Sequence, residues 1–275
     1  MKMYLLVIIL AAAQGVAEFL PISSSGHLLV LGSWFGIDPE KNMTLNVILH
    51  AGTLLAILVF YFKRILSILM ERSRRRLIGL VIAGSVPAAA VGIALKVSGL
   101  DKMIFASPWV AAIGFVFTAT MLLKVFGVPW KTRTDDECDA LGNENMSWKQ
   151  SFLIGCAQAF AITPGISRSG STISAGVLAK LRKADAAEFS FLLAIPAIGG
   201  AALLELMDLL KDPAGNAVAS DWMLYGCGFI VSAVVGYASL AGLITMLKRG
   251  KLGWFACYLY VAAAAVATVQ IIKLF

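Results

Sequence analysis

Two short stretches of the chain carry side chains that could do phosphate chemistry. The first reads Glu18-Phe-Leu-Pro-Ile-Ser-Ser-Ser-Gly-His27, and the second reads Thr163-Pro-Gly-Ile-Ser-Arg-Ser-Gly-Ser-Thr172. The first offers a carboxylate, an imidazole and three hydroxyls, which are groups that act as bases, acids and nucleophiles. The second offers one guanidinium among hydroxyls, and a guanidinium can bind two phosphate oxygens at once. Together they indicate a site for an anionic, phosphate-like group.

The first stretch also predicts a break in a helix. Gln14 and Glu18 are four residues apart, so their side chains share one helix face. Pro21 disfavours helical geometry at Leu20. The serines that follow can cap a second half-helix, which we predict to begin near Gly26, and the free N–H groups there would suit a phosphate.

Plainer interpretations compete with the functional one. Glu18 could be a residue that snorkels to the membrane interface, His27 could be a structural histidine, and Arg168 could pair with Glu18 in the empty protein. An ionisable residue at membrane depth is costly and by default functional. The concentration of these groups at one helix break therefore favours function, whereas His50 is a weaker candidate.

The composition places these residues in a membrane protein. Of 275 residues, 59% are hydrophobic and only 14% are charged, whereas soluble domains carry about a quarter charged residues. The net charge of +7 gathers in two short runs, 63–76 and 248–251, which is the pattern of orientation charge beside membrane spans and not of a nucleic-acid interface. The apolar run 3–13 could pass for a cleaved signal, but it continues into the Glu18 stretch, so we expect it to be retained.

The elements that must position the site are helices. Six apolar segments are long enough to cross a bilayer, and two further apolar segments, 3–36 and 151–180, are each interrupted by Pro, Ser and Gly. Irregular backbone at membrane depth survives only where protein or a water-filled cavity satisfies its polar groups. We therefore predict two re-entrant helix pairs besides six crossings, at 45–62, 77–97, 109–127, 187–210, 222–247 and 252–274.

The two interrupted segments resemble each other at a shift of 144 positions, which matches Gln14 with Gln158 and Ile22-Ser23 with Ile166-Ser167. The predicted fold is thus an all-α polytopic membrane protein with an inverted-topology repeat. Residues 1–127 form the first repeat, 128–150 a cytoplasmic loop, and 151–275 the second repeat.

Loop charges support the inversion. The basic loop 63–76 is predicted to be cytoplasmic, whereas its counterpart near 211–221 is predicted to be external. Both termini are then external, and the tips of the two re-entrant pairs meet near the midplane.

The two motifs, together with the stretch Glu188-Phe-Ser-Phe-Leu-Leu-Ala-Ile-Pro196, closely resemble those of the undecaprenyl-diphosphate phosphatase family, the BacA or UppP type. The similarity covers nearly the whole chain. It implies hydrolysis of undecaprenyl diphosphate to undecaprenyl phosphate and inorganic phosphate, which recycles the carrier lipid for cell-wall synthesis and confers bacitracin resistance. It also implies six crossings and two re-entrant pairs.

By motif position, the resemblance implies that Glu18, Ser24, His27 and Arg168 are the catalytic set. Ser24 is then the nucleophile or a phosphate ligand, with His27 as its acid/base partner, while attack by His27 or by activated water is the alternative. Neighbouring hydroxyl and N–H groups are predicted to bind phosphate: Ser23, Ser25, Gly26, Ser167, Ser169, Gly170 and Thr172.

A divalent cation, Mg²⁺ or Ca²⁺, is associated with the family, and Glu18 and Gln14 are its predicted ligands here. The predicted partners are a polyprenyl diphosphate lipid and the bilayer, with no nucleic acid and with a homodimer left open. The predicted location is the bacterial cytoplasmic (inner) membrane, with the site facing the periplasmic or outer side.

A transporter is the rival function. Broken helices that meet at mid-membrane in an inverted repeat are typical of secondary transporters, so the chain could flip undecaprenyl phosphate instead, or as a second activity. Glu18 favours the enzyme, because anion binding alone does not require a carboxylate.

Overall fold

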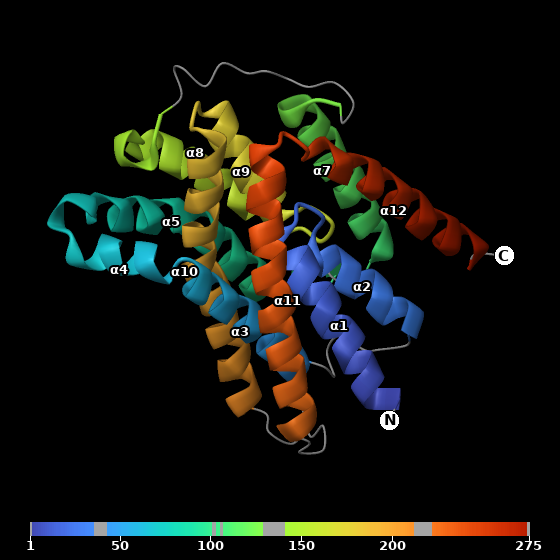
Figure 1. The fold of residues 1–275 in the computed structure, drawn as a ribbon. Coiled ribbons are helices and arrows are strands. Elements are labelled where there is room, and N and C mark those ends of the chain that lie inside the picture. The colour runs from blue at the N-terminus through green and yellow to red at the C-terminus, as the bar shows by residue number, and fades with distance from the viewer. Residues whose placement is uncertain are drawn as a thin grey trace.

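The computed structural model describes residues 2–35, 43–100, 103–104, 107–128, 141–211 and 222–273. These residues form helices and no β-strand; Leu141 and Leu181 make one isolated bridge (Figure 1). The helices are α1 (Lys2–Phe19), α2 (Ser24–Phe35), α3 (Met43–Phe60), α4 (Phe62–Met70), α5 (Arg76–Ser98), α7 (Pro108–Phe126), α8 (Trp148–Phe160), α9 (Arg168–Leu178), α10 (Lys183–Lys211), α11 (Trp222–Lys248) and α12 (Gly253–Ile272).

The helix lengths confirm the predicted class, an all-α polytopic membrane protein. Among the described residues, five helices are long and apolar enough to cross a membrane, namely α5, α7, α10, α11 and α12. The pair α3 and α4 passes the same test as one bent unit, which gives up to six. Helices α2, α8 and α9 have 12, 13 and 11 residues, too few for the ~20 that a crossing needs.

The prediction that residues 63–76 form a loop is wrong. Residues Phe62–Met70 form helix α4, which turns away from α3 by 68° at Tyr61, and a short 3₁₀ turn follows at Arg72–Arg74. The prediction relied on the basic residues and overlooked the apolar residues between them, which have helical spacing. Of these, Ile68 is buried, while Leu66 and Leu69 are exposed. The second half-helix, α2, also begins at Ser24, two residues before the predicted start.

The re-entrant helices are held by partners far away in the sequence. Helix α1 packs on α11 and α8 packs on α5, and α1 and α11 lie side by side in Figure 1. Both contacts use glycine: a Cβ on Gly15 would lie 2.9 Å from the backbone N of Gly236, and one on Gly155 would collide with the carbonyl oxygen of Gly84. Small residues let helix backbones approach closely, which favours association in a bilayer.

Each half of the chain supplies the helix that packs on the broken segment of the other half. The helix before the first break uses α11, and the helix before the second break uses α5, as a two-fold relation between residues 1–127 and 151–275 would require. The division into repeats stays a prediction. Most of loop 128–150 and all of 212–221 lie outside the described residues, so their predicted sides of the membrane also stay predictions.

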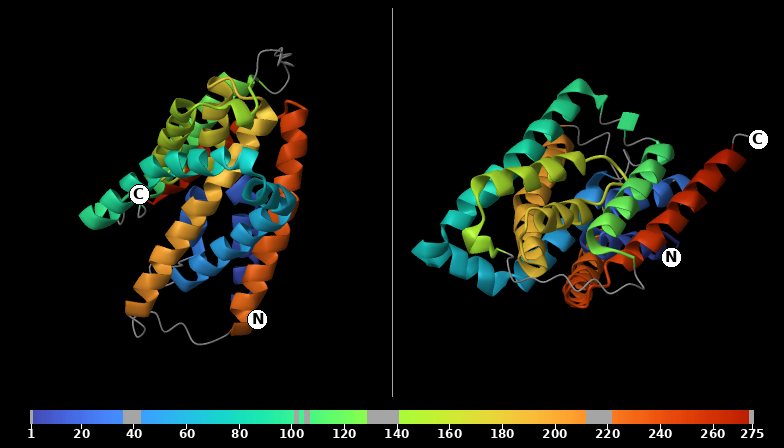
Figure 2. Two further views of the ribbon diagram at one scale, coloured as in Figure 1. Left: turned by 90° about the vertical axis from the view of Figure 1, so that its left-hand side faces the viewer. Right: turned by 90° about the horizontal axis from the view of Figure 1, so that it is seen from above.

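Aromatic packing fixes the end of α1. Phe19 is fully buried and meets Phe191 of α10 edge-on, with ring centroids 5.8 Å apart. Phe191 also stacks against Tyr61, at the bend between α3 and α4, with ring centroids 6.2 Å apart. Figure 2 shows α10 running through the molecule beside the short helices. Phe19, the residue next to Glu18, is therefore anchored in the main hydrophobic core.

Candidate active site

The two breaks predicted from the sequence lie against each other. A Cβ on Gly26 would lie 2.8 Å from the Cα of Gly165, so the start of α2 touches the tip between α8 and α9. The Ser169 hydroxyl at the start of α9 donates to the carbonyl oxygen of Leu20 at 3.3 Å. The structure thus joins two segments that are far apart in the sequence, with 149 positions between Leu20 and Ser169, into one polar site.

Helix α7 holds the tip of the second break. Gly165 has φ +87°, a conformation that a residue with a side chain rarely adopts, and a Cβ there would collide with the carbonyl of Ala111. The Thr118 hydroxyl donates to the Gly165 carbonyl at 3.2 Å and accepts from the Ser167 N–H at 3.0 Å. One fully buried threonine therefore satisfies two backbone groups that the break leaves free.

Each second half-helix begins with a serine cap. The Gly26 N–H donates to the Ser23 hydroxyl at 3.3 Å, and the Gly170 N–H donates to the Ser167 hydroxyl at 3.1 Å. Ser23 has φ +70°, whereas Ser167 has an ordinary extended conformation. The cap predicted for the first break is present and holds a strained backbone, and the second break has a matching cap that was not predicted.

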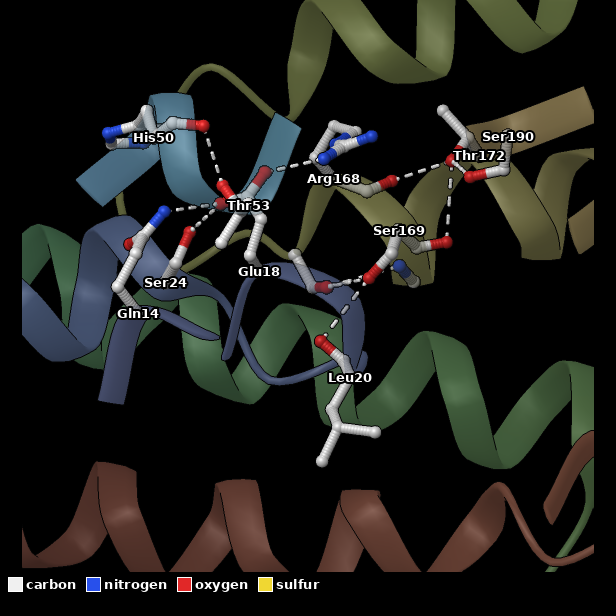
Figure 3. A network of polar contacts seen from close by, with 12 residues as sticks. Gln14, Glu18, Leu20, Ser24, His50, Thr53, Arg168, Ser169, Thr172 and Ser190 are labelled. Atoms are coloured by element: carbon white, nitrogen blue, oxygen red, sulfur yellow. Dashed lines mark hydrogen bonds and ion pairs between the residues drawn. The ribbon is translucent and has the colours of Figure 1, made fainter. Parts of the chain in front are cut away.

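Glu18 is the centre of the site (Figure 3). Its Oε1 accepts from Arg168 Nη2 at 2.5 Å, and its Oε2 accepts from the Ser24 hydroxyl at 2.7 Å and from Gln14 Nε2 at 3.0 Å. The side chain of Glu18 is only 7% exposed. A buried carboxylate needs such partners, and here they come from both breaks.

Arg168 reaches Glu18 from the first turn of α9. The predicted alternative in which these two residues pair in the empty protein is what the structure shows. Only one end of the guanidinium is used, because Nη1 is buried and has no hydrogen-bond partner. The α9 turn is fixed by Thr172, whose hydroxyl donates to the Arg168 carbonyl and is bonded to Ser190 of α10 at 2.5 Å.

The predicted pairing of Ser24 with His27 is not observed. The Ser24 hydroxyl bonds to Glu18, whereas His27 Nδ1 lies 2.8 Å from the Ser23 carbonyl and Nε2 lies 2.6 Å from the Tyr258 hydroxyl. Consecutive turns of α2 point the two side chains at different neighbours. The acceptor of the Ser24 hydroxyl is therefore Glu18.

The predicted phosphate ligands already have partners. Ser23, Gly26, Ser167 and Gly170 take part in the two caps. The hydroxyls of Ser167 and Ser169 are 3.2 Å apart, those of Ser23 and Ser25 are 3.4 Å apart, and Thr172 bonds to Ser190. These seven residues surround the breaks, but their role in binding phosphate stays a prediction.

Several residues of the site carried no clear sequence signal. Thr118, Ser190 and Tyr258 lie in long apolar helices, where an isolated hydroxyl predicts nothing. His50 was a weaker candidate; its Nδ1 is bonded to the Asn46 carbonyl, and it interacts electrostatically with Glu18. Thr53, one turn further along α3, donates to the His50 carbonyl at 2.9 Å, so α3 also borders the site.

The oxygen donors of the site fit a cation that is bound partly by the protein and partly by substrate phosphate, and not a cation held by protein ligands alone. Among the described residues, no three His, Cys, Asp or Glu side chains gather as metal ligands. Gln14 Oε1, however, is buried and has no partner, beside the carboxylate of Glu18. Mg²⁺ is commonly bound by one or two such oxygens together with substrate phosphates.

The fold and the site define a class: a multi-pass membrane protein with a buried carboxylate–arginine–serine site where two broken helices meet. Residues 7–265 match the family model described as bacitracin resistance protein BacA. The undecaprenyl-diphosphatase of Rhodopirellula baltica is 44% identical over 250 residues, covering 91% of each chain. That of Rubrobacter xylanophilus is 37% identical, covering 96% of this chain and 97% of its own.

The chain belongs to the BacA family, which confirms the resemblance that the motifs indicated. A third relative, the undecaprenyl-diphosphatase of Carboxydothermus hydrogenoformans, is 36% identical and covers 96% of both chains. These matches run through both breaks and nearly all of the helices.

Proposed function

We propose that this protein hydrolyses undecaprenyl diphosphate to undecaprenyl phosphate and inorganic phosphate. The relatives carry that name. The observation in this chain that carries the proposal is the hydrogen bond from the Ser24 hydroxyl to Glu18, beside an arginine with an unused, buried nitrogen. A nucleophile, its base and an anion clamp are thereby brought together.

In the first step, the Ser24 oxygen attacks the terminal phosphorus. Glu18 accepts the hydroxyl proton through the existing 2.7 Å hydrogen bond. The bond between the terminal phosphorus and the bridging oxygen breaks, undecaprenyl phosphate leaves with the bonding electron pair, and a phosphoserine remains. Arg168 Nη1 donates to the phosphoryl oxygens, where negative charge builds up as the bond breaks.

In the second step, water cleaves the phosphoserine. The carboxyl of Glu18 returns its proton to the serine oxygen, and the water adds its oxygen to phosphorus, so that inorganic phosphate leaves and both residues are restored. His27 is an acid/base group for this step, near the start of the same half-helix.

A divalent cation would be held by Gln14 Oε1 and Glu18 together with the diphosphate. When bound, such an ion offsets part of the negative charge of the diphosphate. The buried, unpartnered oxygen of Gln14 supports this assignment.

The remaining proposals concern location. The protein lies in the bacterial cytoplasmic (inner) membrane, with the basic runs at 63–76 and 248–251 on the cytoplasmic side. The site then faces the periplasmic or outer side, where conversion of undecaprenyl diphosphate to undecaprenyl phosphate recycles the lipid carrier and confers bacitracin resistance. A homodimer stays a prediction.

Phosphate release by the purified protein in detergent tests the proposal, because no lipid transport is possible there. We expect release from undecaprenyl diphosphate by the wild type and almost none by Glu18→Ala or Arg168→Ala proteins that remain folded. A wild-type protein that binds the lipid without releasing phosphate would favour the transporter instead.

A further inference from the structure

Tyr258 of α12 contacts His27 from outside both motifs. Its hydroxyl is 2.6 Å from His27 Nε2, and the two rings are nearly parallel, at 9°, with centroids 5.6 Å apart. Phe115 of α7 contacts the same imidazole at 4.9 Å. The position of the histidine ring is therefore set by α7 and α12, which pack on each other and lie side by side in Figure 1.

The two hydrogen bonds of His27 define its tautomer. Nδ1 lies 2.8 Å from the carbonyl oxygen of Ser23, and a carbonyl can only accept, so Nδ1 carries the hydrogen. In the neutral ring Nε2 is then an acceptor, and the Tyr258 hydroxyl is its donor. The strained backbone of Ser23, at φ +70°, places that carbonyl.

The hydrogen bond between Tyr258 and His27 bears on the role of His27 in the reaction. Because Glu18 is the base for Ser24, the imidazole is free for another proton transfer. Nε2 is directed toward the Tyr258 hydroxyl and not toward Ser24, whose hydroxyl bonds to Glu18.

We propose that Tyr258 is a positioning residue for the phosphatase reaction: the Ser23 carbonyl sets the Nδ1–H tautomer of His27, and the Tyr258 hydroxyl donates to Nε2 and holds the ring in this orientation, away from Ser24. Tyr258 acts through His27 and does not touch the reacting atoms. The kinetic consequence rests on the proposed function, whereas the tautomer does not.

The kinetic test compares two tyrosines on one helix. In Tyr258→Phe the ring contact stays and the hydrogen bond is lost, so we expect kcat to fall about tenfold, as loss of about 1.4 kcal/mol would give, with KM within about twofold of wild type. Tyr260→Phe is the matched control, because the Tyr260 hydroxyl also makes a hydrogen bond to another helix, to Thr120 of α7 at 2.8 Å, and not to His27. It should keep wild-type kcat.

The spectroscopic test uses the fact that the chain has two histidines. ¹⁵N-histidine labelling of the protein in lipid gives two ring spectra, and a His50→Gln sample assigns that of His27. We expect a protonated Nδ1 and a hydrogen-bonded Nε2 in the wild type, with the Nε2 resonance displaced in Tyr258→Phe and unmoved in Tyr260→Phe.

Three results would overturn the proposal: unchanged kcat in Tyr258→Phe, equal losses in the two tyrosine variants, or a loss of kcat with no displacement of the His27 resonances. A wild-type protein that releases no phosphate would instead refute the proposed function. The nitrogen spectra would still report whether Tyr258 donates a hydrogen bond to His27 Nε2.

Discussion

The two helix breaks have the same framework and different chemistry. At a shift of 144 positions, Ser23 corresponds to Ser167, and both cap a half-helix through a glycine N–H. At the same shift Glu18 corresponds to Ile162, and Ser24 to Arg168. One break therefore supplies the carboxylate and the hydroxyl, and the other supplies the guanidinium.

Gln14 and Gln158, which correspond at the same shift, show how this difference between the breaks affects stability. Gln14 donates to Glu18, whereas its counterpart Gln158, with Ile162 one turn further on, is buried with no partner for either amide atom. A buried polar group without a hydrogen bond is destabilising. The matching residues of the two breaks thus give both the same serine-capped backbone, whereas the positions that differ supply different polar groups to the site.

The largest expected effect comes from changing the charged residues of the two breaks, first one at a time and then by exchanging them. Glu18→Gln or Arg168→Gln leaves one charge buried alone, so we expect phosphate release to fall at least about 10³-fold and stability to fall by about 3–5 kcal/mol. The double variant Glu18→Arg, Arg168→Glu should recover much of the stability and none of the activity, as measured by phosphate release and thermal unfolding in detergent. Near wild-type turnover in the double variant would mean that the two sides are interchangeable.

Ser24→Ala removes the hydroxyl next to Glu18 while keeping the ion pair. We expect turnover to fall by roughly 10³-fold with little change in stability, and a phosphoryl-enzyme that can be trapped in the wild type should disappear. Ser33→Ala is the control on the same helix, because that hydroxyl donates to the Val30 carbonyl one turn earlier and not to Glu18. A Ser24→Ala protein that still forms the phosphoryl-enzyme would rule out serine attack.

The glutamines give a smaller effect. Gln14→Leu removes a donor from Glu18, and we expect it to cost about 1–3 kcal/mol and to lower activity. Gln158→Leu removes an amide that has no partner in the structure, so we expect no loss, or a gain of about 1 kcal/mol. Thermal unfolding of the two variants side by side measures the difference, and equal losses would contradict it.

The serine caps give the smallest effect. Ser167→Ala should cost about 1 kcal/mol, the usual value of an N-cap. Ser23→Ala should cost about 2 kcal/mol, because alanine at φ +70° adds strain, whereas Ser23→Gly should cost only a few tenths. The order of the unfolding temperatures checks this; a Gly variant at 23 less stable than the Ala variant would show that strain is unimportant there.

Much of the fold could be predicted because the membrane limits what backbone can do. Dense clusters of proline, glycine and serine inside an apolar segment indicate a break, and the two segments with such clusters are broken in the structure. A single proline is not enough, because α5 continues through Gly84, Ser85 and Pro87. Helix α4 was missed because Lys63 and Arg64 read as the start of a loop, although the apolar residues around them keep helical spacing.

The site was predictable only as far as its motifs. Glu18 and Arg168 stand out because charge is rare at membrane depth, and the structure joins them. Tyr258 and Thr118 could not be found, because their contacts are made across helices: Tyr258 meets a residue 231 positions away. The hydrogen bond from Ser24 to Glu18 was not predicted, because sequence spacing does not say which of two nearby groups a hydroxyl will face. The role of His27 as acid/base partner of Ser24 stays a prediction.

The crossed packing of α1 on α11 and α8 on α5 has a consequence for synthesis. Helix α8 finds α5 already made when it emerges from the ribosome, but α1 must wait for α11, which begins at Trp222. Glu18 likewise waits for Arg168, 150 residues later. The first helix therefore spends most of translation without its partner, and the site is assembled only when nearly the whole chain has been inserted.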